Sequence, residues 1–278
     1  MEEPMKSALF AMVAAISLSA SAPALGEDTL QLQPLRERLR TIEVEVNGVT
    51  STFLFDTGGG ITTITPAFAE RIGCKPWGRT TGHRMFGDRL DMQRCDGAAI
   101  TAGGLDLGRT TLAVFDPTPL LAPGTAVPEG TLALDVFADK VITLDVAGNR
   151  LIVEDESTLP RRIEGATELP VIVTREVLAA DVYVGWDAPE GRLWFILDSG
   201  AGGVLLISKD HAALLGLDPA AEGPQPLRFD LAPGVPVEGP AVTPEMMLYG
   251  NLGMPFMKDY VLTIDMPNQR LWVRRNPG

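Results

Sequence analysis

The sequence has few of the residues that metal centres and phosphate-binding surfaces use. Its 278 residues include two histidines and two cysteines, with no HExxH motif and no paired Cys/His spacing, so neither a metal site nor a cofactor is expected. Lysine and arginine number 23 against 36 aspartates and glutamates, which gives a net charge of −13 without any basic cluster. A nucleic-acid surface is therefore excluded from the expected functions, and so is docking to anionic lipid.

Long apolar runs are also missing, except near the N-terminus, so no membrane span is expected. Lys6 precedes the apolar stretch ALFAMVAAISLSA, which ends in the small residues SAPALG. This pattern is typical of a signal peptide cleaved after Ala24 or Gly26, with a buried N-terminal helix as the alternative. We expect residues 1–26 to be a signal peptide and the protein to be exported, either to the periplasm or by secretion.

Two segments of the sequence recur in the same order. FLFDTGGGITTI around Asp56 and FILDSGAGGVLLI around Asp198 each place Asp-(Thr/Ser)-Gly between two apolar runs. Further along, VITLDVAGNRLIV at 141–153 matches VLTIDMPNQRLWV at 261–273, and both segments are typical of hairpins. The two matches together indicate an internal duplication.

The duplication predicts two lobes of an all-β chain with short helices. The apolar period is mostly that of strands, and proline and glycine are frequent at turns. We place the first lobe at 38–156, a polar, proline-bearing linker at 157–167, and the second lobe at 168–275. Because both lobes belong to one chain, we expect a monomer whose lobes are related by an internal pseudo-twofold axis. The alternative is a dimer in which each lobe pairs with its equivalent in another chain.

Aspartates at equivalent positions of two such lobes predict a carboxylate pair. A pseudo-twofold axis would bring Asp56 and Asp198 face to face, and like charges a few ångströms apart share one proton. The ionised carboxylate can activate a water molecule while the protonated one polarises a peptide carbonyl. Glycines next to the aspartates let the backbone turn sharply, and small hydroxyls can hydrogen-bond across the axis. The residues expected to support the pair in this way are Thr57, Gly58, Ser199 and Gly200.

The glycines after each aspartate do not predict a phosphate-binding loop. Such a loop opens directly into a helix, whereas Gly58–Gly60 precede the β-branched run ITTI and the glycines after Asp198 precede VLL. The sequence also has no G-x-S-x-G motif, so a serine hydrolase of that kind is not indicated.

The two Asp-(Thr/Ser)-Gly motifs resemble those of the retropepsin and pepsin-like aspartic proteases. The resemblance covers most of residues 40–275 and is greatest to bacterial exported proteins with two fused retropepsin-like units. It implies a bilobal pepsin/retropepsin-like acid protease fold, catalytic roles for Asp56 and Asp198, and a protein or peptide substrate. The sequence thus predicts an aspartic endopeptidase. The alternative is a catalytically inactive, protease-like module that binds peptides or acts as a scaffold.

The resemblance also extends to a segment late in each unit, where the family has an apolar residue, leucine and glycine. NLGMPF matches it at Leu252 and Gly253, whereas TLALDVF has Ala133 in place of the glycine. This difference predicts altered packing beside the catalytic loop of the first lobe.

The family covers its cleft with a hairpin flap, which we place at residues 77–92. The chain runs 85 positions from Asp56 to Val141 but 63 from Asp198 to Val261, so the first lobe has room for it. The proline-rich segment 116–130 is the alternative location of the extra length. Within the flap, the aromatic residues that would contact substrate are Trp77 and Phe86.

Cys74 and Cys95 bracket this expected hairpin. In an oxidising compartment they could form a disulfide that ties its base together. Two free buried thiols are the alternative.

Overall fold

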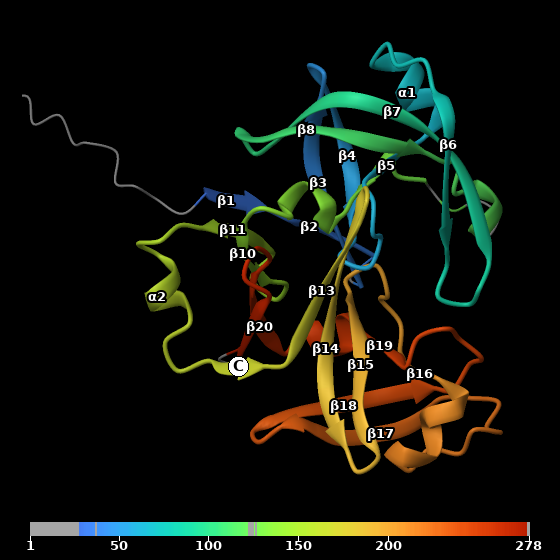
Figure 1. Ribbon diagram of the computed structural model, residues 1–278, viewed down its shortest axis with the longest axis vertical. Helices are drawn as coiled ribbons and strands as arrows, with labels where there is room; N and C mark the ends of the chain where they lie inside the picture. Colours follow the sequence, from blue (N-terminus) through green and yellow to red (C-terminus); the bar gives the residue numbers. More distant parts are fainter. Residues whose placement is uncertain (1–27, 37, 122–124, 126, 277–278) are drawn as a thin grey trace, which may run out of the picture.

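The computed structural model describes residues 28–36, 38–121, 125 and 127–276. The predicted signal peptide, residues 1–26, lies outside the described residues. Most of the described chain is β-strand, arranged in three sheets (Figure 1), which confirms the all-β prediction. No helix in the described part of the chain is long and apolar enough to cross a bilayer.

The first sheet has eight strands, in the order β2-β3-β4-β9-β5-β8-β7-β6. Its strands are β2 (Gln33–Leu35), β3 (Leu39–Val46), β4 (Val49–Phe55), β5 (Thr63–Ile64), β6 (Trp77–His83), β7 (Arg89–Ala102), β8 (Leu105–Val114) and β9 (Gly130–Leu132). Helix α1 (Pro66–Arg71) is capped by the Thr65 hydroxyl, which accepts from the N–H of Phe68 at 3.2 Å. It ends before Gly73, whose φ of 70° is the left-handed conformation that stops a helix.

The second sheet has seven strands, in the order β13-β14-β15-β19-β16-β18-β17. Its strands are β13 (Val171–Glu176), β14 (Ala179–Ala188), β15 (Gly191–Asp198), β16 (Leu205–Ile207), β17 (Gln225–Ala232), β18 (Val235–Val242) and β19 (Gly250–Gly253). The pairings of the first sheet recur here: β4 runs parallel to β9, and β15 runs parallel to β19. Strand β6 is the additional strand of the first sheet.

The third sheet joins the two halves of the chain, in the order β1-β11-β10-β20-β21-β12. Its strands are β1 (Asp28–Gln31), β10 (Val141–Asp145), β11 (Arg150–Glu154), β12 (Thr167–Leu169), β20 (Tyr260–Asp265) and β21 (Arg270–Arg275). The hairpins predicted at 141–153 and 261–273 pair with each other through β10 and β20, with Thr143 opposite Thr263. Their hydroxyl oxygens lie 2.9 Å apart, and the register is symmetric about this pair.

Short helices complete the described chain. They are the 3-10 helices η1 (Thr118–Leu120), η2 (Leu134–Phe137) and η3 (Lys209–Leu215), and the helices α2 (Leu159–Arg162) and α3 (Met254–Met257). Helix η2 follows β9, and α3 follows β19, so the late segments of both halves continue in the same way.

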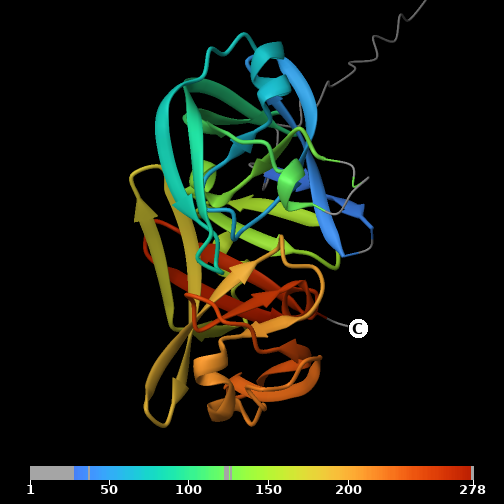
Figure 2. The ribbon, with the colours of Figure 1, turned by 90° about the vertical axis from the view of Figure 1, so that its right-hand side faces the viewer.

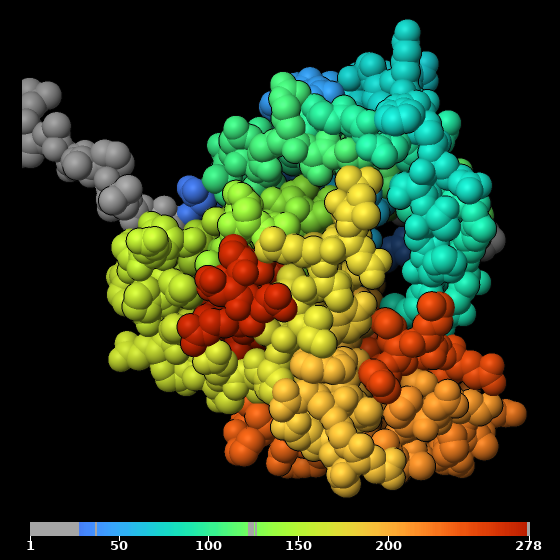
Figure 3. Space-filling model, viewed as in Figure 1, coloured from blue at the N-terminus to red at the C-terminus, as the bar shows by residue number. Residues whose placement is uncertain are grey.

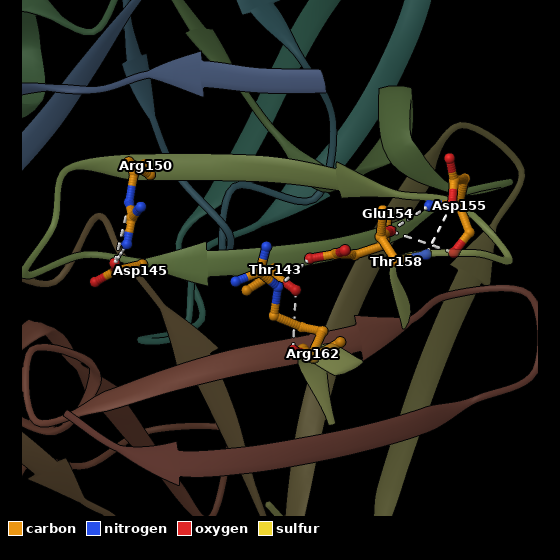
Figure 4. Close-up of polar contacts among 8 residues, drawn as sticks. Thr143, Asp145, Arg150, Glu154, Asp155, Thr158 and Arg162 are labelled. Carbon is orange, nitrogen blue, oxygen red and sulfur yellow. Dashed lines mark hydrogen bonds and ion pairs between the residues drawn. The ribbon is translucent and has the colours of Figure 1, made fainter. Parts of the chain in front are cut away.

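Ion pairs fix the hairpin and linker that lead out of the first half of the chain (Figure 4). Arg150 Nη2 donates to Asp145 Oδ2 at 2.6 Å across the β10–β11 turn, and Gly148 N–H donates to Asp145 Oδ1 at 2.8 Å. The fully buried Glu154 side chain accepts from Nε of Arg162 on α2 at 2.6 Å. A buried charge needs such a partner, so this pair holds α2 against the end of β11.

Fully buried side chains support both strands that end at the aspartates. Phe53 and Phe55 alternate on β4, and Phe195 and Leu197 alternate on β15, each with no exposed surface. Burying such side chains is the main favourable term in folding. The loops that carry Asp56 and Asp198 therefore start from rigid strand ends.

Candidate active site

Asp56 and Asp198 lie against each other's loops. A Cβ atom added to Gly58 would be 2.6 Å from Cγ of Asp198, and one added to Gly200 would be 2.4 Å from Oδ2 of Asp56. Each carboxyl therefore occupies the space over the opposite glycine, which a side chain at that position would fill. The structure thus brings together the two aspartates that the sequence analysis singled out.

The residues after each aspartate bind the opposite loop. The N–H of Thr57 donates to Ser199 Oγ at 3.0 Å, and the N–H of Ser199 donates to Thr57 Oγ1 at 2.9 Å. The Thr57 hydroxyl donates in turn to the carbonyl of Leu197 at 2.7 Å, and the Ser199 hydroxyl to that of Phe55 at 2.9 Å. Both hydroxyls are fully buried, so this closed network fixes the separation of the two loops.

Each aspartate is oriented by its own loop as well. Gly58 N–H donates to Asp56 Oδ1 at 3.0 Å, and Gly200 N–H donates to Asp198 Oδ1 at 2.8 Å, in tight turns of the kind aspartate favours. Burial, and then the negative charge of Asp198, raise the pKa of Asp56 well above its usual range. The charge of Asp198 therefore raises the cost of ionising Asp56.

A third polar side chain, Asn251, contacts the pair. Its Nδ2 lies 2.5 Å from Asp198 Oδ2, and the residue is fully buried. It belongs to β19, where it pairs with Ile196 on β15. The sequence analysis missed Asn251 because it considered only Leu252 and Gly253 of the NLG segment, although a polar residue inside a buried strand was the available signal.

Two further carboxyls lie near the site. Asp181 on β14 lies beside Gly60, and burial, with the charge of Asp198 next in size, raises its pKa to about 7. Asp135 in η2 accepts from the N–H and hydroxyl of Thr62 at 3.0 and 2.5 Å, and burial raises its pKa to about 6. No sequence motif marked either residue. Within the described ranges, no group of three or more His, Cys, Asp or Glu side chains is placed to hold a metal ion.

A long hairpin of β6 and β7 reaches from the first sheet toward the second (Figure 2). At its tip, the carbonyl of Met85 accepts from the N–H of Met247 at 2.8 Å. Met85 Sδ lies 3.7 Å from Nδ2 of Asn251, so the tip reaches the side chain that contacts Asp198. The space-filling view is hollowed between this hairpin and the β13–β14 hairpin (Figure 3).

The hairpin occupies the range expected for a flap, residues 77–92. Part of the extra length of the first lobe lies in β6. Another part lies in the segment between β8 and β9, which is longer than the corresponding segment between β18 and β19. Phe86 lies in the turn and is 44% exposed. Trp77 lies at the base instead, where its indole N–H donates to Asp96 at 3.1 Å, so only Phe86 is carried toward the second lobe.

Cys74 and Cys95 form a disulfide, with Cα atoms 6.1 Å apart. Cys74 follows α1 and Cys95 lies on β7. The disulfide therefore ties the helix to the base of the hairpin.

The alanine in place of glycine at position 133 is accommodated by an exchange of small residues. In the second lobe, a Cβ added to Gly253 would be 2.3 Å from the carbonyl oxygen of Ala201. In the first lobe the residue facing Ala133 is Gly59, and a Cβ added there would still be 3.5 Å from Ala133 Cβ. In each lobe the contact therefore joins one alanine and one glycine. The glycine lies in the loop after the aspartate in the first lobe (Gly59) and in the later segment in the second lobe (Gly253).

Comparison with known proteins agrees with this architecture. A family model described as aspartyl protease matches residues 42–136. Basic 7S globulin from soybean is similar in structure, with a TM-score of 0.57, 9% identity, and 89% of this chain and 94% of that chain covered. Conglutin gamma, a basic 7S globulin from lupine seeds, has a TM-score of 0.58, 8% identity and the same coverage. No curated protein matches the sequence.

These similarities show a mostly β fold that resembles the pepsin-like fold of the basic 7S globulins. Its first lobe carries the aspartyl protease family pattern over residues 42–136, which include Asp56 and Ala133. The predicted resemblance to the retropepsin and pepsin-like aspartic proteases is thereby confirmed.

Proposed function

We propose that the chain is an exported aspartic-type endopeptidase in which Asp56 and Asp198 share one proton and activate a water molecule. The observation that carries the proposal is the placement of each carboxyl over the opposite glycine, within a loop pair cross-linked by Thr57 and Ser199. Two carboxyls packed this closely against each other's loops cannot both be charged, which is the condition for an acid and a base to work together at one site.

The reaction needs no cofactor. The ionised carboxylate takes a proton from water, whose oxygen attacks the carbonyl carbon of the peptide, while the protonated carboxyl donates to the carbonyl oxygen. In the second step one carboxyl donates its proton to the peptide nitrogen as the C–N bond breaks, the other takes a proton from a hydroxyl of the tetrahedral intermediate as the carbonyl re-forms, and one proton again remains on the pair. A peptide would bind in the hollow beside the β6–β7 hairpin (Figure 3), whose turn contains the exposed Phe86.

The organisation of the molecule is part of the proposal. We expect a monomer with lobes at 38–156 and 168–275 joined by the linker 157–167, because one chain supplies both aspartates. Export would follow from cleavage of residues 1–26 and would favour the Cys74–Cys95 disulfide.

The test is digestion of a peptide library by the purified chain across a range of pH. We expect cleavage with an optimum on the acid side, and loss of it in both Asp56→Asn and Asp198→Asn with the fold intact by circular dichroism. The matched control is Asp139→Asn, since that side chain is 79% exposed and should leave activity unchanged. Wild-type rates in either single active-site variant would refute the shared-proton mechanism. Peptide binding without any cleavage would instead support a binding module.

A further inference from the structure

The two aspartates have different sets of hydrogen-bond donors. Both carboxylate oxygens of Asp198 have a donor, since Gly200 N–H lies 2.8 Å from Oδ1 and Asn251 Nδ2 lies 2.5 Å from Oδ2. Among the residues that the structure describes, Asp56 receives a fixed donor only at Oδ1, from Gly58 N–H at 3.0 Å. Hydrogen bonds donated to a carboxyl group favour its ionised form, and a buried donor acts more strongly than one in water.

The position equivalent to Asn251 in the first lobe does not supply a matching donor. Thr131 pairs with Leu54 on β4 as Asn251 pairs with Ile196 on β15, so the two residues hold corresponding places under the two loops. Among the described residues, no hydrogen bond joins Thr131 to Asp56. The pseudo-twofold symmetry of the loops is therefore broken by this one side chain.

We infer that Asn251 is a positioning residue that holds Asp198 as the ionised member of the pair and leaves the shared proton on Asp56. This inference rests on the proposed function and adds a division of labour to it. The carboxylate of Asp198 would take the proton from water, and the protonated Asp56 would donate to the peptide carbonyl.

The other charges at the site make the amide necessary. The titratable groups that face Asp198 are Asp56 from the opposite loop and Asp181 from β14, and both interact with it unfavourably when charged. The neutral donors Gly200 N–H and Asn251 Nδ2 then offset the free-energy cost of a negative charge on Asp198. Met85 Sδ accepts a second hydrogen bond from the same Nδ2 at 3.7 Å, so the amide has an acceptor besides Asp198.

The orientation of the amide gives the inference a clear alternative. If the Asn251 side chain were turned by 180°, its carbonyl oxygen would face Asp198 Oδ2, and two acceptors can approach only with a proton between them. In that arrangement Asp198 would carry the proton and Asp56 the charge. The two arrangements exchange the acid and the base.

The experiment is ¹³C NMR of aspartate carboxyl carbons in the full chain, with signals assigned from Asp56→Asn and Asp198→Asn. Between the two titration steps of the wild-type pair, we expect the proton on Asp56. In Asn251→Leu, which keeps a similar volume without a donor, we expect the lower step to move up by about one pH unit, the effect of losing one hydrogen bond to a charge. The control Thr131→Val should leave both steps in place.

A proton on Asp198 in the wild type, or an unmoved lower step in folded Asn251→Leu, would overturn the inference. If Asn251→Leu fails to fold, the NMR spectrum of the wild type still tests the inference, because it shows which aspartate carries the proton between the two titration steps. Peptide cleavage gives an independent readout, because the acid limb of the kcat/KM profile should shift with the lower step. If the wild type cleaves nothing, the proposed function fails while the NMR titration still tests the role of Asn251.

Discussion

The glycines beside the aspartates give the most direct test of the site. Gly58 and Gly59 are neighbours, and neither has the left-handed φ that would exclude alanine. Yet a Cβ at Gly58 would be 2.6 Å from Asp198 Cγ, whereas a Cβ at Gly59 would be no closer than 3.4 Å to any atom outside its chain neighbours. Gly58→Ala should therefore displace the Asp198 carboxyl, and Gly59→Ala should not.

The size of the effect follows from this geometry. The carboxyl carbon has to move from 2.6 Å to an ordinary contact at 3.4 Å or more. A displacement near 1 Å at a reacting group costs about 100-fold in rate, or about 2.7 kcal/mol of transition-state stabilisation. Overpacking of this kind also costs about 1–3 kcal/mol of folding stability, which lowers Tm by roughly 5 °C in a chain of this length.

The assay compares kcat/KM on one cleaved peptide with thermal melts for wild type, Gly58→Ala and Gly59→Ala. We expect the large loss of activity only in Gly58→Ala, with a folded protein in both variants. If Gly58→Ala kept the wild-type kcat/KM, the carboxyl of Asp198 would not occupy the space over Gly58, and the reasoning about the pair would be refuted.

Two other perturbations test the surroundings of the pair. The pKa of Asp181 is raised from 3.8 to about 7, so its protonated form favours the folded state at low pH, and that contribution is lost as pH rises toward 7. Asp181→Asn should match the wild type in urea unfolding at pH 4 and exceed it by roughly 2–4 kcal/mol above pH 7, and a constant difference across pH would contradict this. Met247→Pro removes the N–H that bonds the Met85 carbonyl, while Met247→Ala keeps it. Hydrogen exchange in β6 and β7 should quicken only in the proline variant, and equal exchange in both would show that this bond does not hold the hairpin closed.

The sequence predicted the parts of the site that local pattern determines. Asp56 and Asp198 were identifiable because each stands at the end of an apolar strand and is followed by a hydroxyl residue and a glycine, and because the two motifs repeat. The hairpin was placed from the resemblance to the retropepsin and pepsin-like proteases, together with the difference in spacing between the two halves of the chain. The pairing of the two distal hairpins through Thr143 and Thr263 completes the same symmetry.

The parts that depend on contacts between distant segments were not predictable in this way. Asp181 lies on a strand of the second lobe, and its raised pKa arises from burial and from the charge of Asp198. Trp77 falls within the hairpin, but only the strand register shows that it lies at the base, opposite Arg94, and far from the turn. For these residues, the sequence pattern does not give the strand register that decides which side chains become buried together.

Ala133 and Asn251 show how two lobes of one fold come to differ. At the Ala133 contact, the first lobe exchanges the positions of alanine and glycine, so the packing is kept while the sequence motif is lost. At the Asn251 contact the change is not compensated, since Thr131 provides no equivalent donor to Asp56. A single chain that supplies both aspartates is free to make this second kind of change, because each aspartate has its own sequence neighbours. In an assembly of two identical chains any such substitution would appear on both sides and would leave the aspartates equivalent. The different hydrogen-bond donors of Asp56 and Asp198 are thus a property that a single chain makes possible.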